Sequence, residues 1–230
     1  MLQLINKKKI YFYILVFFTL TTFFNNNFDK FYKKKFLINK INIYIEPAAF
    51  NEQIKLRLHY LKSENIFSIN KNVIKDKVNS LNYLENIQIK KVYPETINIT
   101  ASQTNIIAIT YLNQKKYFVG NNGKYILADK LNIKKKLPTI FGKFEISDFL
   151  LLKSSLNDVE KSINNITKYY FHKNKRWDVY FNNNILIKLP NRNISHAYKL
   201  FNKFKQSNEI KPNTVVDLRI KNRIVLKNEQ

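Results

Sequence analysis

The sequence predicts an α+β protein that begins with one hydrophobic helix and continues into two folded units. Three observations lead to this prediction. An uncharged apolar run occupies residues 10–24, apolar residues recur at helical spacing within residues 50–84, and apolar and polar residues alternate in several short segments between residues 37 and 226. With 45% hydrophobic and 14% aromatic residues, the 230-residue chain can form a real hydrophobic core.

The apolar run Ile10–Phe24 reads IYFYILVFFTLTTFF and directly follows three lysines. At ~1.5 Å per residue it covers ~22 Å of a hydrocarbon core of ~30 Å, and flanking lysines and asparagines can extend it. Large aromatic residues on every face favour contact with lipid over burial in a protein core. We therefore expect an uncleaved transmembrane helix over residues 10–26, preceded by a short cytoplasmic tail at residues 1–9.

A cleaved secretory signal is the main alternative for this run, because a basic start and a short apolar stretch are typical of one. Cleavage requires small residues at the end of the run, whereas this run ends in Phe23, Phe24 and three asparagines. The basic linker at residues 27–37 holds more lysines than the tail, so the positive-inside rule does not decide the topology. Long domains translocate largely regardless of charge, and we expect the bulk of the chain outside the cytoplasm.

The first folded unit is expected at residues 38–104. The segment KINIYIEP at residues 40–47 alternates like a strand, and residues 50–61 and 73–84 carry apolar side chains at helical spacing. Two further alternating segments flank Pro94-Glu95, where a hairpin turns. The order is therefore β-α-α-β-β, in which two helices can cover one face of a three-stranded sheet.

The second unit, residues 105–226, is expected to be rich in strands, and residues 227–230 form a short tail. A turn at Gly120–Gly123 and another at Asn182–Asn184 separate alternating segments. We expect a loop at residues 137–142, a helix within 146–166 and another at 195–204. The expected strands are Ile106–Leu112, Lys116–Val119, Tyr125–Ala128, Trp177–Phe181, Ile185–Leu189, Val215–Ile220 and Ile224–Leu226.

The charge is strongly unbalanced, with 40 Lys and Arg against 16 Asp and Glu and a net charge of +24. Such a balance favours nucleic acid or an anionic membrane surface as a partner. The lysines are spread along the whole chain, however, and arginine, the better reader of bases and phosphates, is scarce. AT-rich coding would produce the same bias, and we expect no nucleic-acid partner.

Residues that support catalysis are scarce. The absence of cysteine excludes disulfides, thiol nucleophiles and Cys-based zinc sites. His59, His172 and His196 lie far apart in sequence, so we expect surface or satisfied histidines and no metal site. The three glycines form no phosphate-binding loop, and Trp177 is expected to pack in a core or an interface. We predict no enzyme and no cofactor.

The order of these segments resembles the FtsQ/DivIB family of bacterial division proteins. The first unit resembles the family's POTRA domain, and the second resembles its β domain. The resemblance covers nearly the whole chain and rests on the joint order of IYIE at 43–46, IFSIN at 66–70, VYPETINI at 92–99, LPTIFG at 137–142, RWDVYF at 176–181 and VVDLRIKNRIVL at 215–226. This chain departs from the family where Pro47, Ala48, Gln103, Ile106 and Gly120 replace characteristic residues.

The resemblance implies a non-enzymatic scaffold without cofactor, with one pass through the inner membrane, a periplasmic bulk and a place at the division septum. It implies that the scaffold bridges early and late division proteins. Upstream proteins would bind the POTRA domain, and an FtsB/FtsL-like pair would add a strand to a C-terminal edge, here Thr214–Leu226. The candidate contact residues are Val216, Leu218, Arg219, Ile220, Arg223 and Val225.

Arg219 matches the arginine of the family's DLR motif, and we expect it to face an acidic residue of the partner. Two other interpretations stay open for the candidate residues. In the first, Arg219 is a solvated strand charge that contributes ~0 to 1 kcal/mol of stability. In the second, Val216 or Ile220 faces the protein core.

Two other functions are compatible with parts of the sequence. A POTRA-bearing factor of outer-membrane assembly or secretion is one, although POTRA repeats and the long series of alternating strands of a barrel are missing. A basic membrane-anchored binder of nucleic acid or cell-wall polymer is the other, and only the net charge of +24 favours it.

Overall fold

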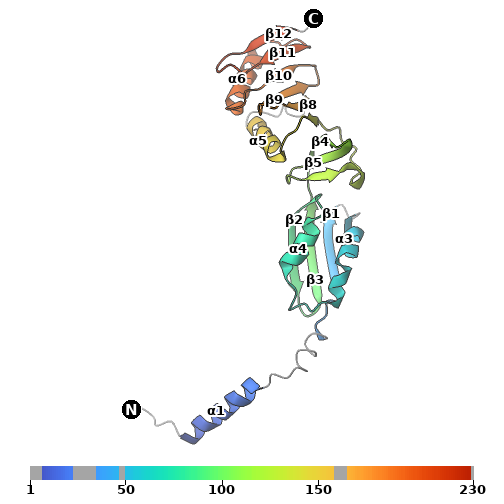
Figure 1. Ribbon diagram of the computed structural model, residues 1–230, viewed down its shortest axis with the longest axis vertical. Coiled ribbons are helices and arrows are strands. Elements are labelled where there is room, and N and C mark those ends of the chain that lie inside the picture. Colours follow the sequence, from blue (N-terminus) through green and yellow to red (C-terminus); the bar gives the residue numbers. More distant parts are fainter. Residues whose placement is uncertain (1–6, 23–34, 47–49, 158–164, 229–230) are drawn as a thin grey trace, which may run out of the picture. The chain divides into compact units, whose positions relative to one another are not determined.

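The computed structural model describes residues 7–22, 35–46, 50–157 and 165–228 (Figure 1). Its contacts divide the chain into two compact units. The first comprises Met1–Ser80 and Asn86–Ser102, and the second comprises Leu81–Glu85 and Gln103–Gln230. Each unit is described separately below.

The N-terminal helix α1 spans Lys7–Thr22, 16 residues. It lies where the sequence predicts a hydrophobic helix, and large apolar side chains are exposed all around it: Ile10, Tyr11, Phe12, Tyr13, Ile14, Leu15, Phe17, Phe18 and Leu20. Within the described ranges, no helix is both long enough and apolar enough to cross a membrane. Residues 23–26 of the expected span, and residues 27–34 of the expected linker, lie outside the described residues.

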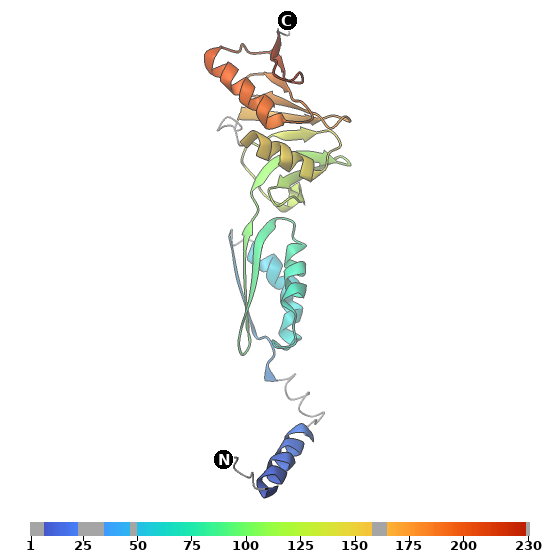
Figure 2. The ribbon, with the colours of Figure 1, turned by 90° about the vertical axis from the view of Figure 1, so that its left-hand side faces the viewer.

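The remainder of the first unit confirms the order β-α-α-β-β. Its elements are β1 (Lys40–Glu46), α3 (Asn51–Leu58), the 3-10 helix η2 (His59–Ser63), α4 (Lys71–Asn79), β2 (Leu84–Val92) and β3 (Thr96–Gln103). The sheet order is β1-β3-β2, and β1 pairs with β3 in parallel from Lys40↔Thr96 to Glu46↔Ser102. Both helices lie on one side of this sheet (Figure 2).

The core of this unit explains the helical spacing in the sequence. Ile54 and Leu58 of α3 and Ile74 of α4 are fully buried, as are Ile97 and Ile99 of β3. Apolar residues four apart in a helix and two apart in a strand therefore meet in one layer between helices and sheet.

Helix α4 is shorter than the sequence predicts. The predicted helix ran from residue 73 to residue 84, but α4 ends at Asn79 and Leu84 begins β2. At its start, the Asn70 side chain accepts a hydrogen bond from the Asn72 N–H at 2.9 Å, which satisfies one of the unpaired amides there. The prediction of the end failed because Leu81 and Leu84 fit a helical period as well as the entry to a buried strand.

The second unit contains one nine-stranded sheet with the order β12-β11-β10-β9-β8-β7-β4-β5-β6. The unit also contains the 3-10 helix η3 (Ala128–Lys130) and the helices α5 (Ile146–Asn157) and α6 (Ile194–Ser207). The strands are β4 (Ile106–Leu112), β5 (Lys115–Gly120), β6 (Tyr125–Leu127), β7 (Thr139–Phe141), β8 (Ile166–Phe171), β9 (Trp177–Phe181), β10 (Leu186–Lys188), β11 (Thr214–Asp217) and β12 (Val225–Asn228).

Two of these strands, β7 and β8, were not predicted from the sequence. β7 replaces part of the expected loop at residues 137–142 and pairs in parallel with both β4 and β8. β8 begins at Ile166, where the sequence predicted the end of a helix, whereas α5 ends at Asn157. Residues 158–164 lie outside the described residues. Both strands are fixed by pairing with distant segments, which local periodicity does not report.

Gly142 explains why the end of β7 looked like a loop. Its φ is +101°, and a Cβ atom added there would lie 2.2 Å from the carbonyl oxygen of Phe171. Only glycine fits such a backbone at that distance. The Phe-Gly pair therefore marks a close approach to β8.

One hydrophobic core joins α5 and α6 to one face of the nine-stranded sheet (Figures 1 and 2). Trp177 of β9 is 3% exposed, and its ring centroid lies 4.7 Å from that of Phe171 and 5.9 Å from those of Phe144 and Phe149. The prediction that Trp177 packs in a core is confirmed. In β9, Val179 and Phe181 are also buried in this core, so the opposite face of the sheet carries Asp178 and Tyr180.

Candidate partner-binding site

The C-terminal end of the nine-stranded sheet has a free edge. β11 pairs in parallel with β10 and antiparallel with β12, with registers from Thr214↔Asn228 to Asp217↔Val225. β12 is therefore the outermost strand at this end, and one side of its backbone has no strand neighbour among the described residues. An edge of this kind presents unpaired N–H and C=O groups that can pair with another chain.

The structure divides the expected edge at residues 214–226 into three parts. β11 is an inner strand, residues 218–224 form a connecting loop, and only residues from Val225 onward lie on the outermost strand. The sequence prediction of one strand from Val215 to Ile220 is wrong, because β11 ends at Asp217.

The six candidate contact residues fall into two groups. Val216 and Leu218 are 0% and 2% exposed and belong to the hydrophobic core, so their side chains are not available to a partner. The expected side-chain contact with a partner is therefore corrected for both residues. The burial of Val216 agrees with the alternative interpretation that this residue faces the core. Arg219, Ile220, Arg223 and Val225 are exposed, with Ile220 at 51% and Val225 at 46%. The structure brings these four together around the loop and β12.

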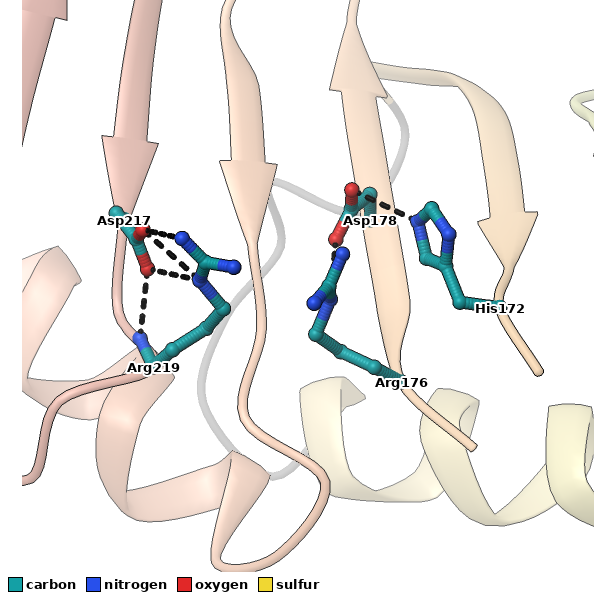
Figure 3. A network of polar contacts seen from close by, with 5 residues as sticks. All are labelled: His172, Arg176, Asp178, Asp217 and Arg219. Carbon is teal, nitrogen blue, oxygen red and sulfur yellow. Dashed lines mark hydrogen bonds and ion pairs between the residues drawn. The ribbon is translucent and has the colours of Figure 1, made fainter. Parts of the chain in front are cut away.

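Arg219 already has a carboxylate partner in its own chain. Asp217 accepts a hydrogen bond from the Arg219 N–H at 3.0 Å, and the guanidinium Nε lies 2.8 Å from both oxygens of that carboxylate. A terminal guanidinium nitrogen also pairs with Asp217 Oδ2 (Figure 3). Hydrogen bonding from Arg219 holds the pKa of Asp217 below its ordinary value, although partial burial acts in the opposite direction.

A second carboxylate lies two strands away and is also paired. Asp178 is 6% exposed, and its Oδ2 lies 2.8 Å from His172 Nε2, while its Oδ1 lies 3.2 Å from Arg176 Nε (Figure 3). Lys188 of β10 stands in register with both Asp178 and Asp217. The helix-free face of the sheet therefore carries alternating negative and positive charges across β9, β10 and β11.

A small cavity lies beside the loop at residues 218–223. Its volume is about 190 Å³, and it is bounded by that loop and by residues 190–200. His196 Nε2 lies 3.0 Å from Asn222 Oδ1 at its rim. The cavity is lined by Arg192, Lys221 and Arg223 and by Arg219, whose charge Asp217 neutralises. No Asp or Glu of the described residues lines it, so its electrostatic potential favours an acidic group.

The site has the features of a binding surface. The part of the chain that the structure describes contains no group of three or more His, Cys, Asp and Glu side chains that could hold a metal ion. The network of His172, Arg176 and Asp178 was not predicted from the sequence. Its signal was a charged residue in the middle of the strand WDVYF, on the face opposite Trp177 and Val179, with an arginine two positions earlier.

The fold and this edge define a class of protein: a compact β-α-α-β-β unit followed by a larger β domain whose last strand is free to pair. Two family models match the chain. The model of the POTRA domain of the FtsQ type matches residues 34–101, and the model of the C-terminal part of the cell division protein FtsQ/DivIB matches residues 108–219. The chain belongs to the FtsQ/DivIB family of cell division proteins.

Individual relatives are distant. The chain is 23% identical over 166 residues to the cell division protein FtsQ of Rhizobium radiobacter, covering 71% of this chain and 79% of that protein. It is equally similar to the FtsQ of Agrobacterium fabrum, but covers only 52% of that protein's length. A solved extracytoplasmic domain of DivIB from Geobacillus stearothermophilus aligns with a TM-score of 0.31 and 16% identity, covering 41% of this chain and 85% of that domain.

Proposed function

We propose that this chain is a non-enzymatic scaffold of the division septum, which bridges early and late division proteins and recruits an FtsB/FtsL-like pair through its C-terminal edge. The observation that carries the proposal is the free edge of β12 (Val225–Asn228), the outermost strand of a nine-stranded sheet. Strand addition at such an edge gains affinity from backbone hydrogen bonds and selectivity from alternating side chains.

The side chains around this edge support a partner segment with apolar and acidic residues. Val225 and Leu226 of β12 are 46% and 45% exposed and point to opposite faces of the sheet. Ile220 adds an exposed apolar side chain in the adjoining loop, and Arg223 adds a cation. Exposed apolar groups beside a free backbone edge would be covered when a strand adds there.

Arg219 has a different role in this proposal from the one expected from sequence. Because Asp217 already neutralises its guanidinium, Arg219 does not offer a free charge to a partner. The Asp217–Arg219 pair instead fixes the start of the loop that carries Ile220, and the exposed Arg223 is the better candidate for a partner's carboxylate.

The proposal includes an inner-membrane anchor at residues 10–26, with residues 1–9 in the cytoplasm and the bulk in the periplasm. It is supported by the apolar side chains exposed around α1, since a helix that is apolar all round gains free energy from surrounding lipid. A topology reporter fused after Gln230 tests this part. The proposal expects a periplasmic signal, and a cytoplasmic signal would contradict it.

Upstream division proteins are proposed to bind the POTRA unit, as the family resemblance implies, without assigned contact residues. The whole function is tested by depleting the chain in its native cell. A septal scaffold should leave filaments without septa, whereas normal division would refute the proposal.

A charge reversal tests the role of the loop. Arg223→Glu should reduce recovery of the FtsB/FtsL-like pair after crosslinking by at least fivefold, because it replaces a cation at the proposed contact with an anion. Arg57→Glu in α3 is the matched control, since Arg57 lies in the other unit and contacts only the Ser80 hydroxyl in the described hydrogen bonds, at 3.1 Å. Equal recovery with both variants would remove Arg223 from the site.

A further inference from the structure

A second cavity lies in the β domain, away from the C-terminal edge. Its volume is about 370 Å³, and it is lined by the start of β4, the loop before β7, one turn of α5 and the start of β8. Its floor is apolar, with buried side chains of Ile107, Phe149 and Tyr169. Three lysines, Lys135, Lys136 and Lys153, line it, and no Asp or Glu among the described residues does.

Lys153 is the most buried of these three lysines. It extends from α5, is half-buried, and forms no ion pair with any carboxylate of the described residues. Partial burial and, second to it, the charge of Lys135 lower the pKa of Lys153. A half-buried ammonium group beside a second cation is stabilised when an anion binds next to it.

The other polar groups at the cavity are suited to an oxyanion. Asn105, Asn165 and Asn182 line it, and their side chains carry amide N–H₂ donors. The backbone around them is held in place, because the Asn182 N–H donates to the Asn165 carbonyl at 2.9 Å. Lysine binds phosphate as a point charge, and a concave site with one sign of charge concentrates counter-ions.

We propose that the cavity lined by Lys135, Lys136 and Lys153 is a binding site for a multiply charged phosphate group, of the pyrophosphate or phosphate-ester class. Three lysines within one cavity match an anion with two or three negative charges better than a single carboxylate, which would neutralise only one of them. The ligand is either a soluble phosphate compound or the headgroup of a phospholipid, because both present the same oxygens.

The test is calorimetric titration of the full chain in non-ionic detergent with sodium pyrophosphate at constant ionic strength. The proposal expects saturable binding of one equivalent, weakened at least tenfold by Lys153→Gln. Lys199→Gln, which removes an exposed lysine of α6, should change the affinity less than twofold. Absence of saturable binding, or equal weakening by both variants, would overturn the proposal.

Two further arms complete the experiment. If water-soluble dihexanoyl phosphatidic acid displaces pyrophosphate, the site binds a lipid headgroup. If pyrophosphate stays bound, the ligand is a soluble phosphate compound.

Lys153→Met should leave the unfolding temperature unchanged or higher while binding falls at least tenfold, because it removes an unpaired half-buried charge. Should this variant fail to fold, the double variant Lys135→Gln/Lys136→Gln replaces it, since both lysines are exposed, and undiminished binding would then overturn the proposal.

Discussion

Asp217 and Arg219, two residues apart at the end of β11, pair through both oxygens of the carboxylate and through the Arg219 backbone N–H. The pair lies where β11 leaves the sheet and the loop toward β12 begins. It therefore links the buried strand to the exposed loop that carries Ile220 and Arg223.

This pair makes stability depend on pH in a defined direction. The pKa of Asp217 is lowered from 3.8 in the folded protein, so the stabilisation is present above pH 3.8 and is lost as the pH falls through the folded pKa. We expect Asp217→Asn to lower the free energy of unfolding in urea by about 0.5 to 1 kcal/mol at neutral pH and to have a smaller effect at a pH below 3.8.

Asp129→Asn is the control for this experiment, because Asp129 is exposed and takes part in none of the ion pairs of the described residues. It should change the stability by less than about 0.5 kcal/mol at either pH. A loss in Asp217→Asn that is the same at both pH values would contradict the role of the pair.

The network around Asp178 predicts a larger effect. Asp178→Ala leaves Arg176, which is 19% exposed at its side chain, without its carboxylate. We expect a loss of about 1 to 3 kcal/mol in urea unfolding. His172→Ala should cost less than Asp178→Ala, because the His172 side chain is 40% exposed and can be hydrated. The reverse order would show that His172 and not Asp178 holds the network together.

Asn202 of α6 offers a stabilising substitution. It is 6% exposed, and neither its Nδ2 nor its Oδ1 has a hydrogen-bond partner within the described residues. Asn202→Leu replaces two unsatisfied polar atoms by methyl groups of similar size, and should raise the free energy of unfolding by about 1 kcal/mol. Calorimetric unfolding of the two proteins measures this, and a lower unfolding temperature would mean that the amide has a native partner.

The aromatic cluster around Trp177 carries much of the β-domain core. Trp177→Ala should lower the free energy of unfolding by about 3 to 5 kcal/mol, since it leaves a cavity between β9 and α5. Leu151→Ala is the control, because Leu151 of α5 is 66% exposed, and its stability should stay within about 0.5 kcal/mol of the parent protein. Similar losses from both would contradict the assignment of the core.

Local patterns in the sequence were sufficient for the first unit. Ile45 of the alternating segment and the helically spaced Ile54 and Leu58 are buried, Ile41 and Ile43 are partly buried, and the β-α-α-β-β order is confirmed. Helix ends were less accurate, because a pair such as Leu81 and Leu84 fits two periods. The positions of elements defined by their own residues were therefore predictable.

Elements defined by pairing with distant segments were not predictable from the sequence. β7 has three residues and exists because Thr139–Phe141 lies between β4 and β8, which are far from each other in sequence. The same reason limits the site. Val216 belongs to the core because its side chain lies on the face of the sheet that packs against the helices, and Arg219 has a partner because β11 ends at Asp217. The VDLR motif indicates the region, but only the sheet order indicates which strand is free.

A pair of proline substitutions in β12 tests whether its free edge binds the partner. In an antiparallel ladder, neighbouring residues direct their N–H groups to opposite sides of the strand, so one of Val225→Pro and Leu226→Pro removes an N–H that faces outward and the other removes one that faces β11. Urea unfolding of each variant identifies which of them weakens the pairing with β11. The measurement is recovery of the FtsB/FtsL-like pair by crosslinking to the full chain. We predict that the variant of unchanged stability recovers at least tenfold less partner, and full recovery with that variant would show that the partner does not pair with β12.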